Sequence, residues 1–408
     1  MSKKMNFQPE EKKLIGGISL VLATRMLGVS LVIPMFSIFA TSIPDSTTTL
    51  AGVAVGIFGI AQTIMQVPMG RLSDSWGRKQ TTVLGLIIYL AGTVFSGMAS
   101  SIYHLIVARI IAGAGAVSGV TMAWLTDGIH RSRRNTALSY VGISIGSSVI
   151  VGFTLSSFIA DIISIPALFY ICGGFIFISV LYIVTRMDNR VVPDDDTDIS
   201  IHSFKTIIGN RDLRRLSITG FIAFFALNGM FFTMPLIMHE QLGVGGLWKV
   251  FLPVAIVGTG CMFYYGRKAD SAGTVKIAMT ALVYELIGIL IIIMGDAVYL
   301  YILGFMLFYA GHCILSPVLP AAVSRYPSDS SRGSVMGVFN SSQFIGASTG
   351  GFFSGVMLDH FDYRILFIAL FLLLLFAIIA ILRYKNFTLH GPLLDEKGQS
   401  LESLHGGR

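Results

Sequence analysis

Apolar stretches of about 20 residues recur along this 408-residue chain and constrain its fold more than any other feature. A helix of that length rises about 30 Å, the thickness of a membrane's hydrocarbon core, whereas barrel strands would alternate over about ten residues. With a mean hydropathy of +0.75, the chain is predicted to be an all-α integral membrane protein. The predicted transmembrane helices cover residues 14–40, 49–70, 80–98, 102–126, 137–160, 165–185, 216–238, 247–266, 276–295, 297–321, 333–358 and 364–383.

Lys and Arg side chains gather on one side of this predicted topology. If the N-terminus and every second loop lie in the cytoplasm, most of the 29 basic residues fall on that side. Both termini are therefore expected in the cytoplasm, in a multi-pass protein of the cell's inner membrane. The same asymmetry accounts for the net charge of +7, so the basic balance requires no nucleic-acid partner.

The longest polar break, residues 186–215, divides the spans into two groups of six. We expect an N-terminal bundle over 1–185, a cytoplasmic linker over 186–215, a second bundle over 216–385 and a cytoplasmic tail over 386–408. The HSFKTII stretch of the linker is predicted to be a short helix on the membrane surface. Three cysteines fall inside predicted spans, where we expect packing roles rather than disulfides: Cys172, Cys261 and Cys313.

A charged loop, GRLSDSWGRK, follows the second span and contains Gly70, Asp74, Gly77, Arg78 and Lys79. After the eighth span, GRKADSAGTVK repeats both glycines and the aspartate at matching positions. Each copy follows the second helix of a six-helix group, which indicates an internal duplication. Duplication in a membrane protein of this size is typical of a transporter whose site lies between two halves.

The loop pattern G-x-L-x-D-x-x-G-R-K resembles the loop 2–3 signature of the major facilitator superfamily. The stretches TRMLGVSLVIP, LIVARIIAGAGA, LWKVFL and SSQFIGASTGG are further similar to the drug:proton antiporter family of the YajR type. This resemblance covers about residues 14–383 and implies the major facilitator fold, with two pseudo-symmetric six-helix bundles and alternating access. The fifth span keeps its glycines but lacks the proline of the antiporter signature, so this part of the resemblance is incomplete.

The resemblance also implies that the loop acts as a conformational latch. Its glycines would allow a tight turn, Asp74 would meet the positive N-terminal end of the eleventh span, and Arg78 would pair with Asp127. Such contacts would form when the cytoplasmic side is closed and would stabilise the outward-facing state. The alternative is that these charges only set topology. The predicted latch residues are Gly70, Asp74, Gly77, Arg78, Lys79 and Asp127.

Ionisable side chains inside the bilayer are costly unless they face a cavity or a partner, which makes each of them a candidate for proton coupling. Glu285 has no fixed cation nearby in its span, and His312 carries an imidazole, the side chain that proteins use most often to take up and release protons. The resemblance implies roles for Arg25 and Arg109 in binding an anionic group or moving protons. The alternative for all four is a structural role: pairing with backbone carbonyls for Arg25, outward snorkelling for Arg109, a hydrogen bond from a protonated carboxyl to a neighbour for Glu285, and satisfied packing for His312.

Polar and aromatic residues in the spans are the candidates for lining a substrate cavity. They are Gln62, Gln66, Asn228, Phe231, Asn340 and Gln343. The alternative is that the amides only join neighbouring helices by hydrogen bonds. Because few fixed charges lie in the second half, we expect a mostly apolar cavity that suits small amphipathic molecules.

Nucleotide-binding loops, nucleophile motifs and metal-ligand clusters do not occur in the sequence, so an enzyme is not predicted. We expect no cofactor and no metal, with the proton gradient as the energy source. The predicted function is secondary transport by a monomer, most simply proton-coupled efflux of amphipathic molecules. A proton-coupled symporter, a uniporter of a metabolite and a lipid or lysolipid translocase are the alternatives.

Overall fold

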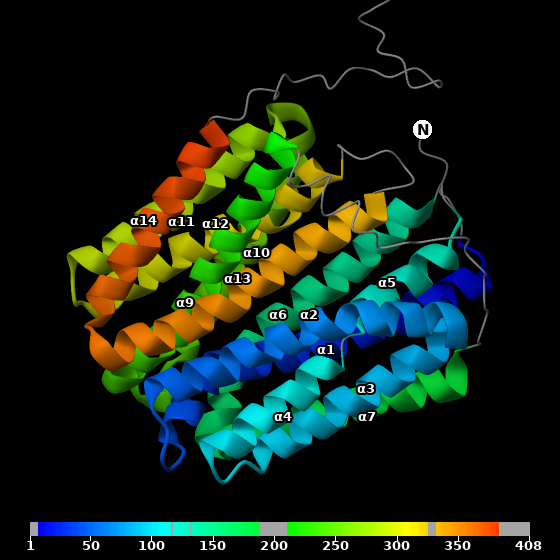
Figure 1. Cartoon of the computed structure of the whole chain (residues 1–408), viewed down its shortest axis with the longest axis horizontal. Helices are drawn as coiled ribbons and strands as arrows, with labels where there is room; N and C mark the ends of the chain where they lie inside the picture. Colours follow the sequence, from blue (N-terminus) through cyan, green and yellow to red (C-terminus); the bar gives the residue numbers. More distant parts are fainter. Residues whose placement is uncertain (1–6, 116, 131–132, 188–209, 325–331, 383–408) are drawn as a thin grey trace, which may run out of the picture.

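The computed structural model describes residues 7–115, 117–130, 133–187, 210–324 and 332–382, and helices dominate these ranges (Figure 1). The helices are α1 (Pro9–Ser42), α2 (Thr48–Trp76), α3 (Arg78–Gly97), α4 (Ile102–Ala114), α5 (Ser118–Asp127), α6 (Arg134–Ile162), α7 (Ile165–Arg186), α9 (Arg211–Gly246), α10 (Trp248–Ala272), α11 (Thr274–Met294), α12 (Val298–Val323), α13 (Arg332–His360) and α14 (Tyr363–Leu382). The helix expected in HSFKTII and the tail over 386–408 lie outside the described residues.

These helices confirm the predicted membrane fold. Within the described ranges, eleven segments are long and apolar enough to cross a membrane, and α13 is a further long helix of lower hydropathy at the position of the eleventh predicted span. The fourth predicted span differs in detail, because it is divided into α4 and α5 after Ala114. A Cβ on Gly115 would lie 2.5 Å from the carbonyl oxygen of Gly85, so the break allows a backbone approach that only glycine permits.

Two groups of helices form the molecule, and we call α1 to α7 the first half and α9 to α14 the second half. The signature end is the end of the bundle that carries residues 70–79, and the opposite end is the other one. The halves share a packing pattern. Gly152 and Ser156 of α6 lie against α1, where the Ser156 hydroxyl donates a hydrogen bond of 2.6 Å to the Leu31 carbonyl. Gly350 and Ser354 of α13 lie in the same way against α9.

Small residues bring the two halves into close contact along α2 and α13, which lie side by side (Figure 1). Gly52, Gly56 and Gly59 of α2 face Ser348 and Gly355 of α13, and a Cβ on Gly56 would lie 2.4 Å from the Ser348 carbonyl oxygen. In a membrane, where apolar surface is already solvated by lipid, such close packing is a main source of helix association. This glycine seam runs from the opposite end to about the middle of α2.

Candidate functional site

The signature loop folds around a single glycine. α2 continues through Gly70 to Trp76, so the turn falls at Gly77 alone, whose φ of 109° is in the region that favours glycine. Arg78 begins α3, and its guanidinium donates to Asp74 Oδ1 at 2.5 Å and to Asp127 Oδ2 at 3.0 Å. The arginine therefore joins the ends of α2, α3 and α5.

Both carboxylate partners of Arg78 belong to the first half. The ion pair between Arg78 and Asp127 therefore forms without any contribution from the second half. Its presence does not by itself show that the two halves are closed against each other at the signature end. Lys79 donates to the carbonyl oxygens of Val184 at 3.1 Å and Met187 at 2.5 Å, which ties the loop to the end of α7. The contact expected between Asp74 and the start of the eleventh span involves side chains outside the described residues.

The second copy of the loop has the same backbone turn. α10 ends at Ala272 and Gly273 follows with a φ of 86°, directly before α11, as Gly77 stands between α2 and α3. The duplication indicated by the sequence is thus repeated in the turn geometry.

Two arginines lie on one aromatic patch inside the first half. The Arg25 guanidinium lies 5.6 Å from the centre of the Tyr89 ring and donates to the Ser118 hydroxyl. The Arg109 guanidinium lies 4.3 Å from the centre of the Phe58 ring, which itself contacts Tyr89. Among the described residues, no carboxylate lies within ion-pair distance of either arginine. Ring faces therefore supply much of their compensation.

Glu285 and His312, which the sequence presents as separate candidates, are neighbours. Glu285 Oε1 of α11 lies 3.4 Å from His312 Nδ1 of α12, and the Glu285 side chain is 0% exposed. No other charged partner of Glu285 occurs in the described part of the chain. The two helices are pressed together here, because a Cβ on Gly311 would lie 2.9 Å from Glu285 Cγ. The structure therefore contains a buried acid and base pair within one half.

His312 faces the interior side of this pair. Its ring meets the ring of Phe224 on α9 edge to face, with centroids 4.9 Å apart. The His312 side chain keeps 7% exposure, so it shields the fully buried carboxyl of Glu285. The imidazole therefore lies between the Glu285 carboxyl of α11 and the Phe224 ring of α9.

The remaining predicted cavity residues occupy different environments. Gln62 and Gln343 are buried, and the stem of Gln343 lies against Gly220 of α9. Asn228 donates to the Phe224 carbonyl oxygen one turn earlier on its own helix, at 3.3 Å. Gln66, on the same helix as Gln62, and Asn340 are half-buried. In the described part of the chain, no hydrogen bond joins two of these amides.

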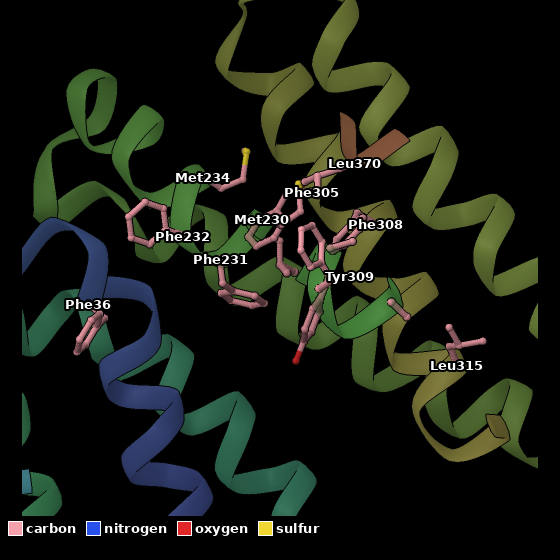
Figure 2. Packing of buried hydrophobic residues seen from close by; sticks show 14 of the residues in the cluster. Phe36, Met230, Phe231, Phe232, Met234, Phe305, Phe308, Tyr309, Leu315 and Leu370 are labelled. Atoms are coloured by element: carbon pink, nitrogen blue, oxygen red, sulfur yellow. The ribbon is translucent and has the colours of Figure 1, made fainter. Parts of the chain in front are cut away.

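Phe231 belongs to an aromatic cluster that joins the halves and that the sequence does not reveal. Its ring lies 5.3 Å from that of Phe153 on α6, and 5.2 Å and 5.6 Å from those of Phe305 and Tyr309 on α12. Figure 2 shows the Phe231 and Tyr309 rings next to each other within the buried hydrophobic cluster. The only signal in the sequence is the abundance of Phe, with 29 residues, which does not say which rings meet.

In the described part of the chain, long apolar helices in two similarly packed halves, with ionisable side chains buried inside them, are typical of a membrane transporter. The chain matches the model of the Major Facilitator Superfamily over residues 18–274 and 260–402, and it belongs to that family.

Its relatives include the inner membrane transport protein YajR of Escherichia coli, 26% identical over 375 residues, or 88% of this chain and 81% of that protein. Multidrug resistance protein 1 of Bacillus subtilis is 28% identical over 177 residues, covering 43% of this chain and 45% of that protein. Among solved structures, a bacterial homologue of the human lysosomal transporter Spinster covers 92% of this chain and 97% of its own, with a TM-score of 0.77 and 13% identity. The nucleoside transporter NupG covers 93% and 100%, with a TM-score of 0.73 and 15% identity.

Proposed function

We propose that this transporter exports small amphipathic molecules from the cytoplasm in exchange for protons, and that Glu285 and His312 form its proton-binding pair. The observation that carries the proposal is the buried contact between these two side chains, 3.4 Å apart with little exposure. In the proposed orientation both termini and the signature end face the cytoplasm, as the distribution of basic residues indicates.

The pair has a physical reason to hold one proton. With one proton, it is either a neutral acid beside a neutral imidazole or a carboxylate beside an imidazolium, and in both cases its net charge is zero. Removing that proton leaves a buried negative charge, and adding another leaves a buried positive charge, each costing several kcal/mol without water. Exchange of the proton is therefore favoured only in a conformation that admits water to His312.

Few other groups compete for this proton. On α12, Tyr309 and Cys313 flank His312, and on α11 Tyr284 is engaged by Tyr265 of α10 with their hydroxyls 3.1 Å apart. α9 contributes the apolar ring of Phe224, and α14 carries no titratable side chain between residues 365 and 382. The imidazole is thus the proposed relay and Glu285 the proposed store.

Two observations that do not involve Glu285 or His312 support the substrate class. Several relatives are multidrug resistance proteins, which favours export of compounds with large apolar surfaces. Arg25 and Arg109 have aromatic rings beside them but no carboxylate within ion-pair distance in the described ranges. Two such cations favour an amphipathic substrate that carries an acidic group over a lipophilic cation.

The test uses the full chain in liposomes with an imposed pH gradient and a panel of fluorescent amphipathic anions and cations. The native protein is expected to move a member of the panel against its concentration gradient. Glu285→Gln keeps the shape of the side chain but cannot release a proton. It is expected to abolish gradient-driven transport and to leave exchange of substrate for substrate.

Asp296→Asn is the matched control, because Asp296 is a carboxylate of the same half that lies in the loop between α11 and α12. It is expected to transport as the native protein does. Full gradient-driven transport by Glu285→Gln would contradict the proposed role of the pair. Transport that ignores the pH gradient in the native protein would instead identify a uniporter.

A further inference from the structure

The carboxylate of Asp359, at the end of α13 in the second half, lies on the start of α2 in the first half. Asp359 Oδ1 accepts hydrogen bonds from the backbone N–H of Thr48 at 3.0 Å and from the Thr48 hydroxyl. Its Oδ2 accepts from the backbone N–H of Thr49 at 2.7 Å. One side chain of the second half therefore caps a helix of the first half at the opposite end.

This contact completes the hydrogen bonding of the α2 N-terminus. The first backbone N–H groups of a helix have no acceptor within the helix and carry its positive end charge. Thr47 serves one of them, because its hydroxyl accepts from the N–H of Leu50 at 3.1 Å. Asp359 accepts hydrogen bonds from the N–H groups of Thr48 and Thr49. The hydrogen bonding of the α2 N-terminus is therefore complete only while the two halves are in contact here.

A related contact occurs where α6 meets the start of α10. Asp161 is the second-last residue of α6, as Asp359 is of α13, and both helices carry the Gly-x-x-x-Ser pattern described above. Gly245 lies two residues before Leu247, the N-cap of α10, and a Cβ on Gly245 would lie 2.5 Å from Asp161 Oδ2. Two corresponding aspartates thus touch the other half at corresponding places, and the aromatic rings of Phe158 and Trp248 meet beside the second contact.

We infer that Asp359 is a cross-half latch that holds the opposite end of the transporter closed by capping α2, with Asp161 as its weaker counterpart at α10. Opening the opposite end requires α2 to separate from α13, which leaves Asp359 and the two N–H groups to water. The cap therefore contributes only to the closed state and biases the equilibrium toward it.

The test measures how often the opposite end opens. Ser348 is buried in the glycine seam, and Ser348→Cys provides an isosteric probe that reacts with a water-soluble maleimide only when the seam separates. The three native cysteines are first replaced by serine. Asp359→Ala is expected to raise the alkylation rate about 2- to 30-fold, the range expected from loss of a helix cap.

Asp296→Ala is the matched control, since Asp296 also lies at the opposite end and accepts several hydrogen bonds, but all of them come from its own half. It is expected to leave the alkylation rate unchanged. A second control retains Cys172, which is buried between α1 and α7 within the first half and reports general unfolding. Its rate is expected to be equal in all variants.

A second variant approaches the contact from the other side. Thr48→Pro removes the N–H and hydroxyl donors, yet proline is favoured at the first position of a helix, and Thr47 already has extended backbone angles. It is expected to raise the rate in the same direction, and adding it to Asp359→Ala is expected to give little further increase. Equal rates for Asp359→Ala and Asp296→Ala would overturn the inference. Because no substrate or proton gradient enters this assay, its outcome is independent of the proposed antiport.

Discussion

The glycine seam predicts that one added methyl group shifts the conformational equilibrium of the whole transporter. In Gly56→Ala the new Cβ would lie 2.4 Å from the Ser348 carbonyl oxygen, whereas ordinary contact begins at 3.4 Å. α2 and α13 must therefore move apart by about 1 Å, and the neighbouring atom is backbone that cannot rotate away. Overpacking of this kind costs about 1–3 kcal/mol, and it acts only in the state in which the seam is closed.

The expected result is an increase of about 5- to 150-fold in the ratio of seam-open to seam-closed molecules. Spin labels at Met98→Cys in the first half and Tyr299→Cys in the second half report it, because these side chains are 63% and 70% exposed near the opposite end. The distance distribution between the labels is expected to gain a longer component in Gly56→Ala.

Gly142→Ala on α6 is the control, since a Cβ there would meet no atom within 4 Å. Both substitutions bring the same gain in helix propensity, about 0.5–1 kcal/mol, which is equal in the open and closed states and cancels. Identical distance distributions in the two variants would refute the reasoning, because they would show that the seam yields without separating the halves.

Two further predictions concern charged contacts within one half. Arg78→Gln and Asp127→Asn are each expected to lower stability by about 1–2 kcal/mol in thermal unfolding in detergent. The double variant is expected to lose less than the sum, because both substitutions remove the same charged hydrogen bond between Arg78 and Asp127. Strictly additive losses would argue against a coupled pair. Hydrogen bonds from Arg364, Tyr363 and Tyr301 hold the pKa of Asp296 below its ordinary value, so this carboxylate stabilises the fold above about pH 4–5 and the contribution is lost as pH falls through the lowered pKa. The melting temperatures of the native protein and Asp296→Asn are therefore expected to differ near neutral pH and to converge as pH falls through the lowered pKa. A difference that does not shrink as pH falls would contradict this assignment.

Much of the fold follows from the sequence, because hydrocarbon thickness and backbone hydrogen bonding leave a membrane chain few choices. Segment length and hydropathy predict the twelve spans, and the repeated loop predicts the two halves. The break between α4 and α5 is not predicted, since it depends on how closely Gly115 approaches α3. The presence of glycine at position 77 predicts the turn there. The glycine at position 70 leads to the same prediction, which is wrong because α2 continues through Gly70.

The candidate site is less predictable, because hydropathy does not say which faces of two helices meet. Glu285 and His312 are each recognisable as intramembrane ionisable groups, yet their 3.4 Å contact depends on the rotation of α11 and α12 about their axes. Asp359 carries even less signal, since an acidic residue after a span usually marks only the membrane boundary. Its role emerges from the positions of Thr48 and Thr49, which are more than 300 residues away in the chain.

The composition of α13 has a consequence for how the protein is made. Its serines and glycines allow close contact with α2 on one side and α9 on the other, but they leave α13 outside the eleven segments that are apolar enough to cross a membrane by themselves. Insertion machinery that selects segments by hydrophobicity receives a weak signal from this helix. α9 and α2 are both synthesised earlier, so they are available as partners when α13 emerges from the ribosome. Insertion of α13 is therefore expected to depend on contact with these earlier helices more than insertion of the other spans does.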